Sequence, residues 1–452
     1  MTEQNLQRSP AAYFDVREEA STGERRQKPA SVGEKSSQAE NEVKTRSAAS
    51  NQSGEKDFNE AYPGGSTERS PAAYFGVRED ASTGERRQKP AKTLLSLYIH
   101  WPFCLTKCPY CDFFSKVNKG ADETRLVEEY LEDLHYYHDL TAEREINTIF
   151  FGGGTPSLMK PQNIEKIIEQ TAKLWPVSKD VEISLEANPN SNRPQMFSDL
   201  RQAGINRLSL GVQALNQADL KFFGRSHTLE EALQALEEVK NTFDNHSLDL
   251  IYARPQQKLS DWEKELQQTA GFGLNHISLY QLTIEPGTVF YKQGIQPLEE
   301  ERAAEMYEFT ASFLNNAGYN RYEISNFART GKECRHNLTY WRGNDYLGIG
   351  PGAHGRLKLD GVSYALTHRR QSEKLTATER AEELLIMGLR ISEGIDKKRF
   401  QNQCGLDFDK FINLKHAEEF VQSGLIINTS GCLRLTDKGF LLLDNIIERL
   451  AF

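Results

Sequence analysis

The chain has 452 residues, a formal net charge of −9 and 26% charged residues, a length that predicts two or three domains with ample core. Its mild acidity and the lack of a basic stripe argue against a nucleic-acid partner, and no apolar run is long enough to span a bilayer. Six cysteines, three of them clustered, and an N-terminus without the apolar core of a secretory signal predict a cytoplasmic protein with metal chemistry rather than a disulfide framework.

Residues 1–92 differ in composition from the rest of the chain. They are rich in Ser, Glu, Arg, Gln and Gly and carry no sustained apolar period, which predicts disorder. One segment occurs twice, as RSPAAYFDVREEASTGERRQKPA from Arg8 and as RSPAAYFGVREDASTGERRQKPA from Arg69. Two copies are too few for a stacked repeat domain, which needs about three units. We interpret the pair as a duplicated or inserted genetic element, with a tethering arm for a partner as the alternative.

From Thr93 onward, strand-like and helix-like patterns alternate. The strand-like runs cover 95–100, 146–151, 181–186, 205–212, 247–253 and 275–282. Helical patterns lie between them at 123–140, 162–174, 193–203, 229–243 and 261–269. This alternation predicts a parallel sheet, either open or closed as a barrel.

The unusual residues of this region lie toward the carboxyl ends of the predicted strands. The clustered cysteines follow the first strand, a glycine triplet follows the second, Glu186 ends the third, Gln213 follows the fourth and Asp249 lies in the fifth. Barrel-type α/β proteins carry their active sites at this end, whereas an open doubly wound sheet concentrates them near one switch point. The fold class that we predict is therefore α/β, with a partial (β/α)6-type barrel.

The part of the chain beyond Pro297 is expected to be mixed. A helical segment at 299–316 leads to YNRYEISNFA at 319–328 and then to a loop-rich stretch at 334–355. Further helices are expected at 376–389 and 408–423, and a hairpin turning at Ser430-Gly431 precedes a terminal helix. This end predicts an α+β, winged-helix-like unit that has few basic residues, so packing is expected rather than DNA binding. The predicted divisions are an extension at 1–92, a barrel at 93–330 and a C-terminal region at 331–452.

Cys104, Cys108 and Cys111 stand in a C-x3-C-x2-C spacing directly after the first strand. A loop this short can turn three thiolates toward one point, as a metal cluster requires. Zinc sites usually have four protein ligands, and no fourth cysteine follows nearby. In a cubane iron–sulfur cluster each of four irons is usually held by a cysteine, so three thiolates would leave one iron open for another ligand. Three unrelated loop cysteines are the alternative.

The glycine triplet Gly152–Gly154, followed by Thr155 and Pro156, is a second signal. Glycines at a strand end let the backbone approach a ligand without a Cβ in the way. No Lys-Ser/Thr follows and Pro156 lacks an N–H, so this is not a phosphate loop. Its bare carbonyl and N–H groups suit a ligand with an amine and a carboxylate. An ordinary glycine turn is the alternative.

Glu186, Gln213, Arg225 and Asp249 are polar residues placed to line the same mouth. Glu186 can accept hydrogen bonds from an ammonium or from ribose hydroxyls, and Arg225 suits a carboxylate. Taken singly, each is also typical of surface or salt-bridge positions.

The cysteine spacing and the flanking YIHWPFC resemble the radical S-adenosylmethionine (SAM) superfamily. In that superfamily, SAM chelates the open iron of a 4Fe–4S cluster, and a glycine-rich stretch after the second strand binds the methionyl amine. From about Leu95 to the C-terminus, the chain is similar to the family that contains oxygen-independent coproporphyrinogen III oxidase. The resemblance implies that Cys104, Cys108 and Cys111 hold the metal cluster. It implies cofactor contacts at Tyr98, Tyr110, Gly153, Gly154, Thr155, Glu186, Gln213, Arg225 and Asp249.

Two features resemble a haem-chaperone branch of this family rather than the oxidase. The oxidase has a further cysteine two residues after the third ligand, where this chain has Phe113. The chain also carries HNLTYW at 336–341, and the motif H-N-x-x-Y-W is implicated in haem binding in that branch. The resemblance therefore implies haem as a ligand and His336 as a haem-binding residue, with the aromatic faces of Tyr340 and Trp341 against the macrocycle.

Some details stay open at this stage. Cys334 and His354 are rival axial ligands of haem iron. The chain has Ala253 and Arg254 where the family usually has glycine and leucine, which leaves the detail of the fifth loop in doubt.

Two functions of different classes are compatible with these residues. The first is a haem chaperone that binds haem, a 4Fe–4S cluster and SAM and transfers haem to an acceptor protein. The alternative is a radical SAM oxidoreductase, an oxygen-independent coproporphyrinogen III oxidase that forms protoporphyrinogen IX by oxidative decarboxylation. The implied partners are haem, an unidentified acceptor, and an electron donor if SAM is cleaved. A peripheral membrane contact through the acceptor and a homodimer are also compatible with the resemblance.

Overall fold

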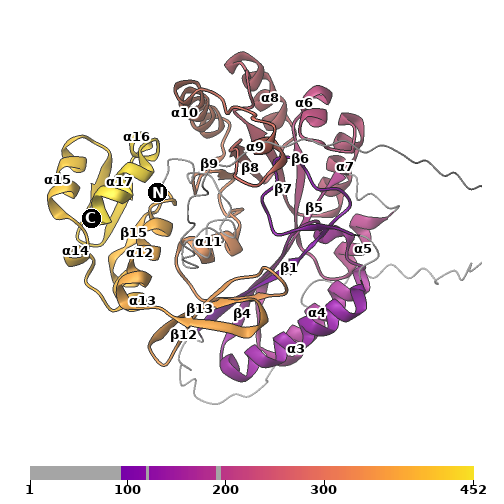
Figure 1. Ribbon diagram of the computed structural model, residues 1–452, viewed down its shortest axis with the longest axis horizontal. Coiled ribbons are helices and arrows are strands. Elements are labelled where there is room, and N and C mark those ends of the chain that lie inside the picture. Colours follow the sequence, from indigo (N-terminus) through magenta and orange to yellow (C-terminus); the bar gives the residue numbers. More distant parts are fainter. Residues whose placement is uncertain (1–92, 119–121, 190–194, 452) are drawn as a thin grey trace, which may run out of the picture.

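A twelve-stranded sheet runs through the computed structural model, which describes residues 93–118, 122–189 and 195–451 (Figure 1). The strand order is β14-β13-β12-β11-β1-β4-β5-β6-β7-β8-β10-β9. Six parallel strands form its centre: β1 (Leu94–Trp101), β4 (Glu145–Gly153), β5 (Val177–Ala187), β6 (Arg207–Gln213), β7 (Asn245–Tyr252) and β8 (His276–Gln281). The predicted α/β fold class is confirmed. The duplicated segment and the disorder predicted for 1–92 lie outside the described residues.

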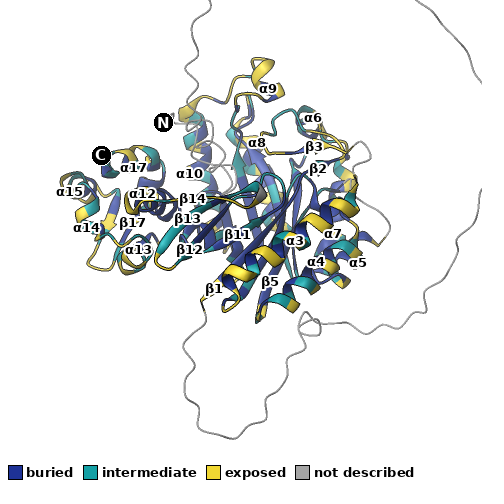
Figure 2. Ribbon diagram, turned by 60° about the horizontal axis from the view of Figure 1, so that its bottom comes forward, coloured by how far each residue is buried: buried dark blue, intermediate teal, exposed yellow. Residues whose placement is uncertain are grey.

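Helices cover the outer face of these strands, and their outward sides are exposed (Figure 2). The larger ones are α3 (Glu123–Thr141), α4 (Pro161–Leu174), α5 (Met196–Gln202), α7 (Leu229–Thr242), α8 (Leu259–Gly271) and α10 (Glu300–Asn316). Shorter turns lie at η2 (Pro156–Leu158), α6 (Gln217–Phe222) and α9 (Val289–Lys292). The chain begins α7 with a capping box in which Thr228 and Glu231 exchange hydrogen bonds, which satisfies backbone N–H groups that a helix start leaves free.

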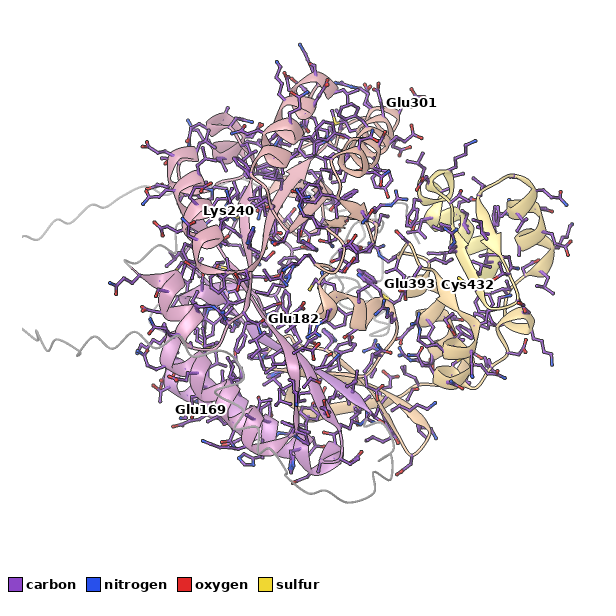
Figure 3. The ribbon with its side chains drawn as sticks, turned by 180° about the vertical axis from the view of Figure 1, so that it is seen from behind. Glu169, Glu182, Lys240, Glu301, Glu393 and Cys432 are labelled. Atoms are coloured by element: carbon purple, nitrogen blue, oxygen red, sulfur yellow. The ribbon has the colours of Figure 1, made fainter. Side chains whose placement is uncertain are left out.

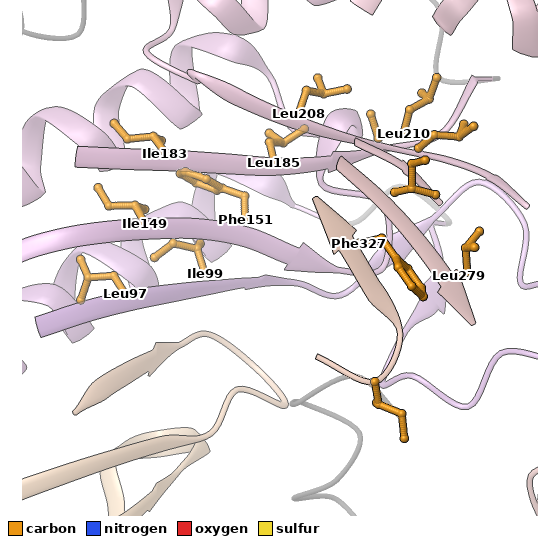
Figure 4. Close-up of a cluster of buried hydrophobic side chains, with 14 of the residues drawn as sticks. Leu97, Ile99, Ile149, Phe151, Ile183, Leu185, Leu208, Leu210, Leu279 and Phe327 are labelled. Carbon is orange, nitrogen blue, oxygen red and sulfur yellow. The ribbon is translucent and has the colours of Figure 1, made fainter. Parts of the chain in front are cut away.

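Apolar and polar side chains alternate along the central strands, which gives the sheet an apolar outer face and a polar inner face. Outward residues such as Ile99, Ile149 and Leu185 pack with the helices in one continuous core (Figure 4). Inward residues include buried Glu182 and Arg207, because successive side chains of a strand point to opposite faces. Both faces are therefore buried, and the interior of the curved sheet is lined with polar groups.

The sheet is wider than the six predicted strands. Strand β11 (Tyr346–Ile349) pairs in parallel with β1, and three antiparallel strands follow it: β12 (Gly355–Leu359), β13 (Val362–Thr367) and β14 (Gln371–Lys374). On the other edge, β10 (Asn326–Ala328) and β9 (Asn320–Arg321) run antiparallel. A short turn, η4 (His368–Arg370), joins β13 to β14. The stretch 334–355 is thus not mainly loop, since it also contains α11 (Arg335–Trp341).

The C-terminal unit lies beside this sheet and has its own three-stranded sheet, in the order β15-β17-β16 (Figure 1). Its elements are α12 (Ala377–Gly388), β15 (Ile395–Asp396), α13 (Lys397–Cys404), α14 (Phe408–Phe411), α15 (Leu414–Gln422), β16 (Ile426–Asn428), β17 (Cys432–Leu435), α16 (Asp437–Phe440) and α17 (Leu443–Ala451). The single helix predicted at 408–423 is wrong. The chain breaks there because Asn413 caps a new helix by accepting from the backbone N–H of His416. The division of the chain at residue 331 stays a prediction.

Candidate cofactor site

A cavity of about 230 Å³, here called the outer cavity, lies at the carboxyl ends of the central strands. Its wall contains all three clustered cysteines, as the sequence predicted for a site at this edge. The other predicted residues on this wall are Tyr110, Gly153, Gly154, Thr155, Glu186, Gln213, Arg225 and Asp249. Residues far apart in the sequence thus meet at one site.

The loop that carries the cysteines is held closed by its own hydrogen bonds. It begins with the two-residue strand β2 (Phe103–Cys104), which pairs with β3 (Lys116–Val117). Between these strands, the backbone N–H of Cys111 donates to the carbonyl of Cys108 over 3.2 Å. Lys107 Nζ donates to the carbonyls of Phe113 and Ser115 over 3.0 and 3.2 Å. Lys107 therefore holds the loop in its closed conformation by bonding to two of its carbonyls.

The cysteines are not spaced as ligands of one metal ion. Across the described ranges, no three His, Cys, Asp or Glu side chains are close enough together to share a single ion. A mononuclear site with metal–sulfur bonds of about 2.3 Å needs sulfurs within roughly 4 Å of one another. In a cubane each thiolate binds a different iron, so its sulfurs stand farther apart. Three free cysteines on one cavity wall are the donor set that suits such a cluster.

The glycine triplet packs tightly against the cysteine loop. Gly154 donates its N–H to the carbonyl of Trp101 over 2.6 Å, and a Cβ built on Gly154 would lie 2.6 Å from the carbonyl oxygen of Phe103. Gly153 has φ +107°, and a Cβ there would lie 2.7 Å from the ring of His100. Glycine is needed because any side chain would push the two loops apart. The sequence indicated close approach to a ligand, and the structure adds close approach to the cysteine loop.

Arg225 connects the cysteine loop to the neighbouring strand ends. Its Nη1 donates to Cys108 Sγ over 3.4 Å, and its Nη2 donates to the carbonyl of Gly211 over 2.8 Å and to Asn188 Oδ1. Asn188 in turn donates to Thr155 Oγ1 over 3.0 Å. A guanidinium beside a sulfur stabilises negative charge on that sulfur. Sequence reasoning missed Asn188, although it stands two residues after Glu186.

Glu186 and Asp249 form an acidic wall in the outer cavity. Asp249 accepts from Ser209 Oγ over 2.9 and 3.0 Å and from Ser247 Oγ over 3.2 Å. Burial, with the nearby charge of Asp249, raises the pKa of Glu186 to about 8. Burial also raises the pKa of Asp249. Each side chain keeps some exposure because it faces the cavity. Such a wall favours a ligand with positive charge, whose binding lowers the cost of ionising the carboxyls.

A second, inner cavity of about 80 Å³ lies deeper within the curved sheet. Tyr98 lines this cavity rather than the outer one. Six residues line both cavities: Phe113, Gly153, Glu186, Ser209, Asp249 and Tyr280. The two spaces therefore adjoin at the acidic wall.

His336 lies in α11, is fully buried and lines neither cavity. Its Nδ1 is 2.7 Å from Thr148 Oγ1, and its Nε2 is 2.7 Å from the hydroxyl of Tyr340. Burial, helped by the charge of Arg207, lowers the pKa of His336 to about 3. The imidazole is thus neutral with both nitrogens engaged. Binding of haem by His336 stays a prediction that requires one of these hydrogen bonds to open.

Cys334 and His354, the other two candidate ligands of haem iron, differ in how far they are buried. Cys334 is fully buried, its Sγ lies 3.5 Å from Glu182 Oε1, and burial raises its pKa to about 12, so the group is a thiol. His354 is half-buried in the turn between β11 and β12. No contact of either residue with haem follows from this geometry.

The structure resolves the doubt about the fifth loop. Ala253 has φ +54°, a left-handed conformation that glycine adopts without cost. Arg254 is buried and pairs with Glu265, which also accepts from the backbone N–H of Leu215 over 2.7 Å. Arg254 Nε lies 3.2 Å from Asp219. A buried ion pair therefore holds this loop.

The chain matches two known protein families. Residues 98–268 match the radical SAM superfamily, and residues 375–442 match the HemN C-terminal domain. The heme chaperone HemW of Buchnera aphidicola (from Acyrthosiphon pisum, strain APS) is 37% identical over 78% of this chain and 97% of its own length. The heme chaperone HemW of Escherichia coli is 34% identical over the same shares. The chain belongs to the HemW family.

Relatives that carry another name have a similar sequence identity to this chain. The mitochondrial radical S-adenosyl methionine domain-containing protein 1 of Bos taurus is 34% identical over 81% of this chain and 90% of its own length. The solved structure of coproporphyrinogen III oxidase (HemN) from Escherichia coli, a radical SAM enzyme, matches with a TM-score of 0.67 and 22% identity over 80% of this chain and 90% of that chain. This likeness shows that the chain has the same fold as that oxidase.

Membership of the radical SAM superfamily implies a 4Fe–4S cluster and SAM as cofactors. The outer cavity fits them, because it combines three thiols for a cluster, an acidic wall for a cationic ligand and bare backbone at the glycine triplet. Helices that could cross a membrane are absent from the described ranges of this chain.

Proposed function

We propose that this protein is a haem chaperone that holds a 4Fe–4S cluster and SAM, binds haem and passes it to an acceptor protein. The observation that carries this proposal is the similarity to heme chaperone HemW, which extends over 97% of the relative's length at 37% identity. A second observation favours it over the coproporphyrinogen oxidase alternative. The residue two positions after Cys111 is Phe113, where the oxidase has a further cysteine.

In this proposal, Cys104, Cys108 and Cys111 hold the cluster, and the outer cavity holds SAM. When bound, the cluster supplies electrons and an open iron site. Arg225 stabilises the thiolate of Cys108 across 3.4 Å. Lys107 fixes the loop so that its sulfurs face the cavity.

The remaining predicted contacts receive separate roles around SAM. Glu186 and Asp249 accept from the cationic and hydroxyl groups of SAM, while Gly153, Gly154 and Thr155 present their backbone to its methionyl end. Tyr98, Tyr110 and Gln213 complete the walls. Tyr110 and Gln213 belong to the outer cavity and Tyr98 to the inner one.

The haem site in this proposal lies on the side of α11. His336 is the proposed axial ligand, and ligation through Nε2 requires the hydroxyl of Tyr340, now 2.7 Å away, to move aside. Tyr340 and Trp341 line the inner cavity, so their aromatic faces are the nearest part of the motif to a bound ligand.

We further propose that the protein works in the cytoplasm and exists as a homodimer that meets its acceptor at the membrane surface. We keep the division into an extension at 1–92, a barrel at 93–330 and a C-terminal region at 331–452.

A chain lacking residues 1–92 should bind haem and retain its cluster like the full chain. A failure of that truncated chain to fold would show that folding requires the extension.

Two anaerobic assays on the reconstituted full chain test the function. In the first, the haem-loaded protein is mixed with an apo-protein acceptor such as apomyoglobin, and haem transfer is followed by absorbance. In the second, coproporphyrinogen III and a reductant are supplied with SAM. Haem binding and transfer without protoporphyrinogen formation is expected. Formation of protoporphyrinogen would overturn the chaperone proposal in favour of the oxidase.

A further inference from the structure

The sulfur of Cys108 stands beside a charged hydrogen-bond donor. Arg225 Nη1 donates to Cys108 Sγ over 3.4 Å, and the hydroxyl of Tyr110 bonds to the same residue. Hydrogen bonds to the sulfurs are among the features that set the reduction potential of an iron–sulfur cluster. The contact with Arg225 therefore bears on the redox state of a bound cluster as well as on its assembly.

Arg225 lies in the turn between α6 and α7, and this turn packs against the cysteine loop. Gly224 has φ +64°, and a Cβ built on it would lie 2.8 Å from the ring of Pro109. The backbone N–H of Arg225 donates to the carbonyl of Leu220 over 2.9 Å. The arginine side chain therefore starts from a fixed point close to Cys108.

Asn188 holds the far end of the same side chain. Its Oδ1 accepts from Arg225 Nη2, which also donates to the carbonyl of Gly211 over 2.8 Å. Asn188 is anchored in turn, because its Nδ2 donates to Thr155 Oγ1 over 3.0 Å. The guanidinium is planar, so two acceptors at Nη2 fix the direction in which Nη1 points. That direction is toward the sulfur.

These contacts differ from those of an arginine reserved for the carboxylate of a ligand. Such an arginine offers both arms of its fork to one carboxylate. In this site one arm of Arg225 reaches a sulfur, and the other reaches a carbonyl and an amide oxygen. The protein itself thus engages the guanidinium at the cysteine loop.

We propose that Asn188 is a positioning residue, which holds Arg225 against Cys108 and thereby raises the reduction potential of the cluster. The inference rests on the part of the proposed function in which the three cysteines hold a 4Fe–4S cluster. An added electron makes the cluster and its thiolates more negative. A cation that donates to one of the sulfurs therefore stabilises the reduced form more than the oxidised form.

The test is an anaerobic potentiometric titration of the reconstituted full chain, followed by the EPR signal of the reduced cluster. No SAM is added, so the loss of a SAM contact cannot produce a shift. Arg225→Met keeps an unbranched side chain and removes the charge and the N–H groups. At a fixed potential, the ratio of oxidised to reduced cluster should rise about tenfold, which is a midpoint about 59 mV more negative for one electron. Asn188→Ala should shift the midpoint in the same direction by a smaller amount.

The double variant Asn188→Ala/Arg225→Met separates a positioning role from a direct one. If Asn188 acts through Arg225, the double variant should have the midpoint of Arg225→Met alone, because residues of one network are not additive. Additive shifts would show that Asn188 acts on the cluster by itself, and they would overturn the positioning role.

The matched control is Asn163→Ala on α4, which removes an amide that donates to Glu123 Oε1 over 2.7 Å on the outer helices. It should have the wild-type midpoint. Iron and sulfide contents are measured for every variant, because a midpoint belongs to the clusters that are present and does not depend on their yield. If Arg225→Met retains no cluster, Asn188→Ala decides alone, and a wild-type midpoint in that variant would overturn the inference.

The failure of the inference and the failure of the proposed function give different results. Wild-type midpoints in both Arg225→Met and Asn188→Ala would overturn the inference while the cluster site stands. A wild-type chain that takes up no iron and sulfide on reconstitution would overturn the cluster site in the proposed function, and the inference with it.

Discussion

The affinity of the protein for SAM should rise with pH because of Glu186. Burial and the charge of Asp249 raise the pKa of Glu186 to about 8 in the cofactor-free site. About 10% of such carboxyls are ionised near pH 7, and about half near pH 8. If the ionised form accepts from the cationic groups of SAM, binding selects that form, and the apparent Kd contains its population.

The magnitude follows from that population. Between about pH 6 and about pH 8, the ionised fraction of a group with a pKa of about 8 rises from about 1% to about 50%. The apparent Kd should therefore fall roughly 50-fold over this interval and level off at higher pH. The sign is fixed because the pKa is raised: protonation at low pH removes the acceptor.

The assay is anaerobic equilibrium dialysis of the reconstituted protein with SAM at a series of pH values. The amino group of SAM titrates in the same region, so the informative quantity is the difference between the wild type and Glu186→Gln. The variant should lose most of the pH dependence. The exposed Glu169 on α4 (Figure 3) supplies the control, Glu169→Gln, with a wild-type profile. Parallel profiles for the wild type and Glu186→Gln would refute the reasoning.

Three further predictions concern the buried ion pair, the glycine triplet and the haem motif. Arg254→Leu should lower the free energy of unfolding in urea by about 3–5 kcal/mol because it leaves Glu265 buried and unpaired, and adding Glu265→Leu should recover most of that loss. A lone Arg254→Leu with wild-type stability would contradict this. Gly154→Ala should reduce the iron and sulfide content after reconstitution, since its Cβ would lie 2.6 Å from a carbonyl of the cysteine loop; full occupancy would show that the loops can separate. His336→Ala should remove the low-spin spectrum of bound haem, with recovery on adding imidazole, and Tyr340→Phe should strengthen binding by freeing Nε2; unchanged spectra in both would reassign the ligand.

The central strands and their helices were predictable because their hydrophobic patterns are long. The six strands expected from 95 to 282 are all present, and their polar ends meet at the outer cavity. The cysteine loop was predictable for a different reason, since its three cysteines lie close together in the sequence and need no distant residue to identify them. Local order in the sequence was enough for both features.

The parts that sequence reasoning missed depend on distant partners. Helix α11 has seven residues, too few to show a helical period, and its start is stabilised by Glu182, more than 150 positions earlier. A signal for the inner cavity did exist. The strand sequences VEISLEA and RLSLGVQ alternate polar and apolar residues, which places Glu182, Arg207 and Ser209 on one inner face.

The position of β1 has a consequence for biosynthesis. The strand that leads into the cysteine loop lies between β4 and β11, and Leu97 pairs with both Ile149 and Leu347. A ribosome adds roughly 5–20 residues each second, so this strand waits tens of seconds for its second neighbour. During that time β1 is paired on one side only. Iron that arrived then would meet the three thiols before the surrounding cavity wall has folded. Cluster insertion should therefore be a late event that follows release of the polypeptide.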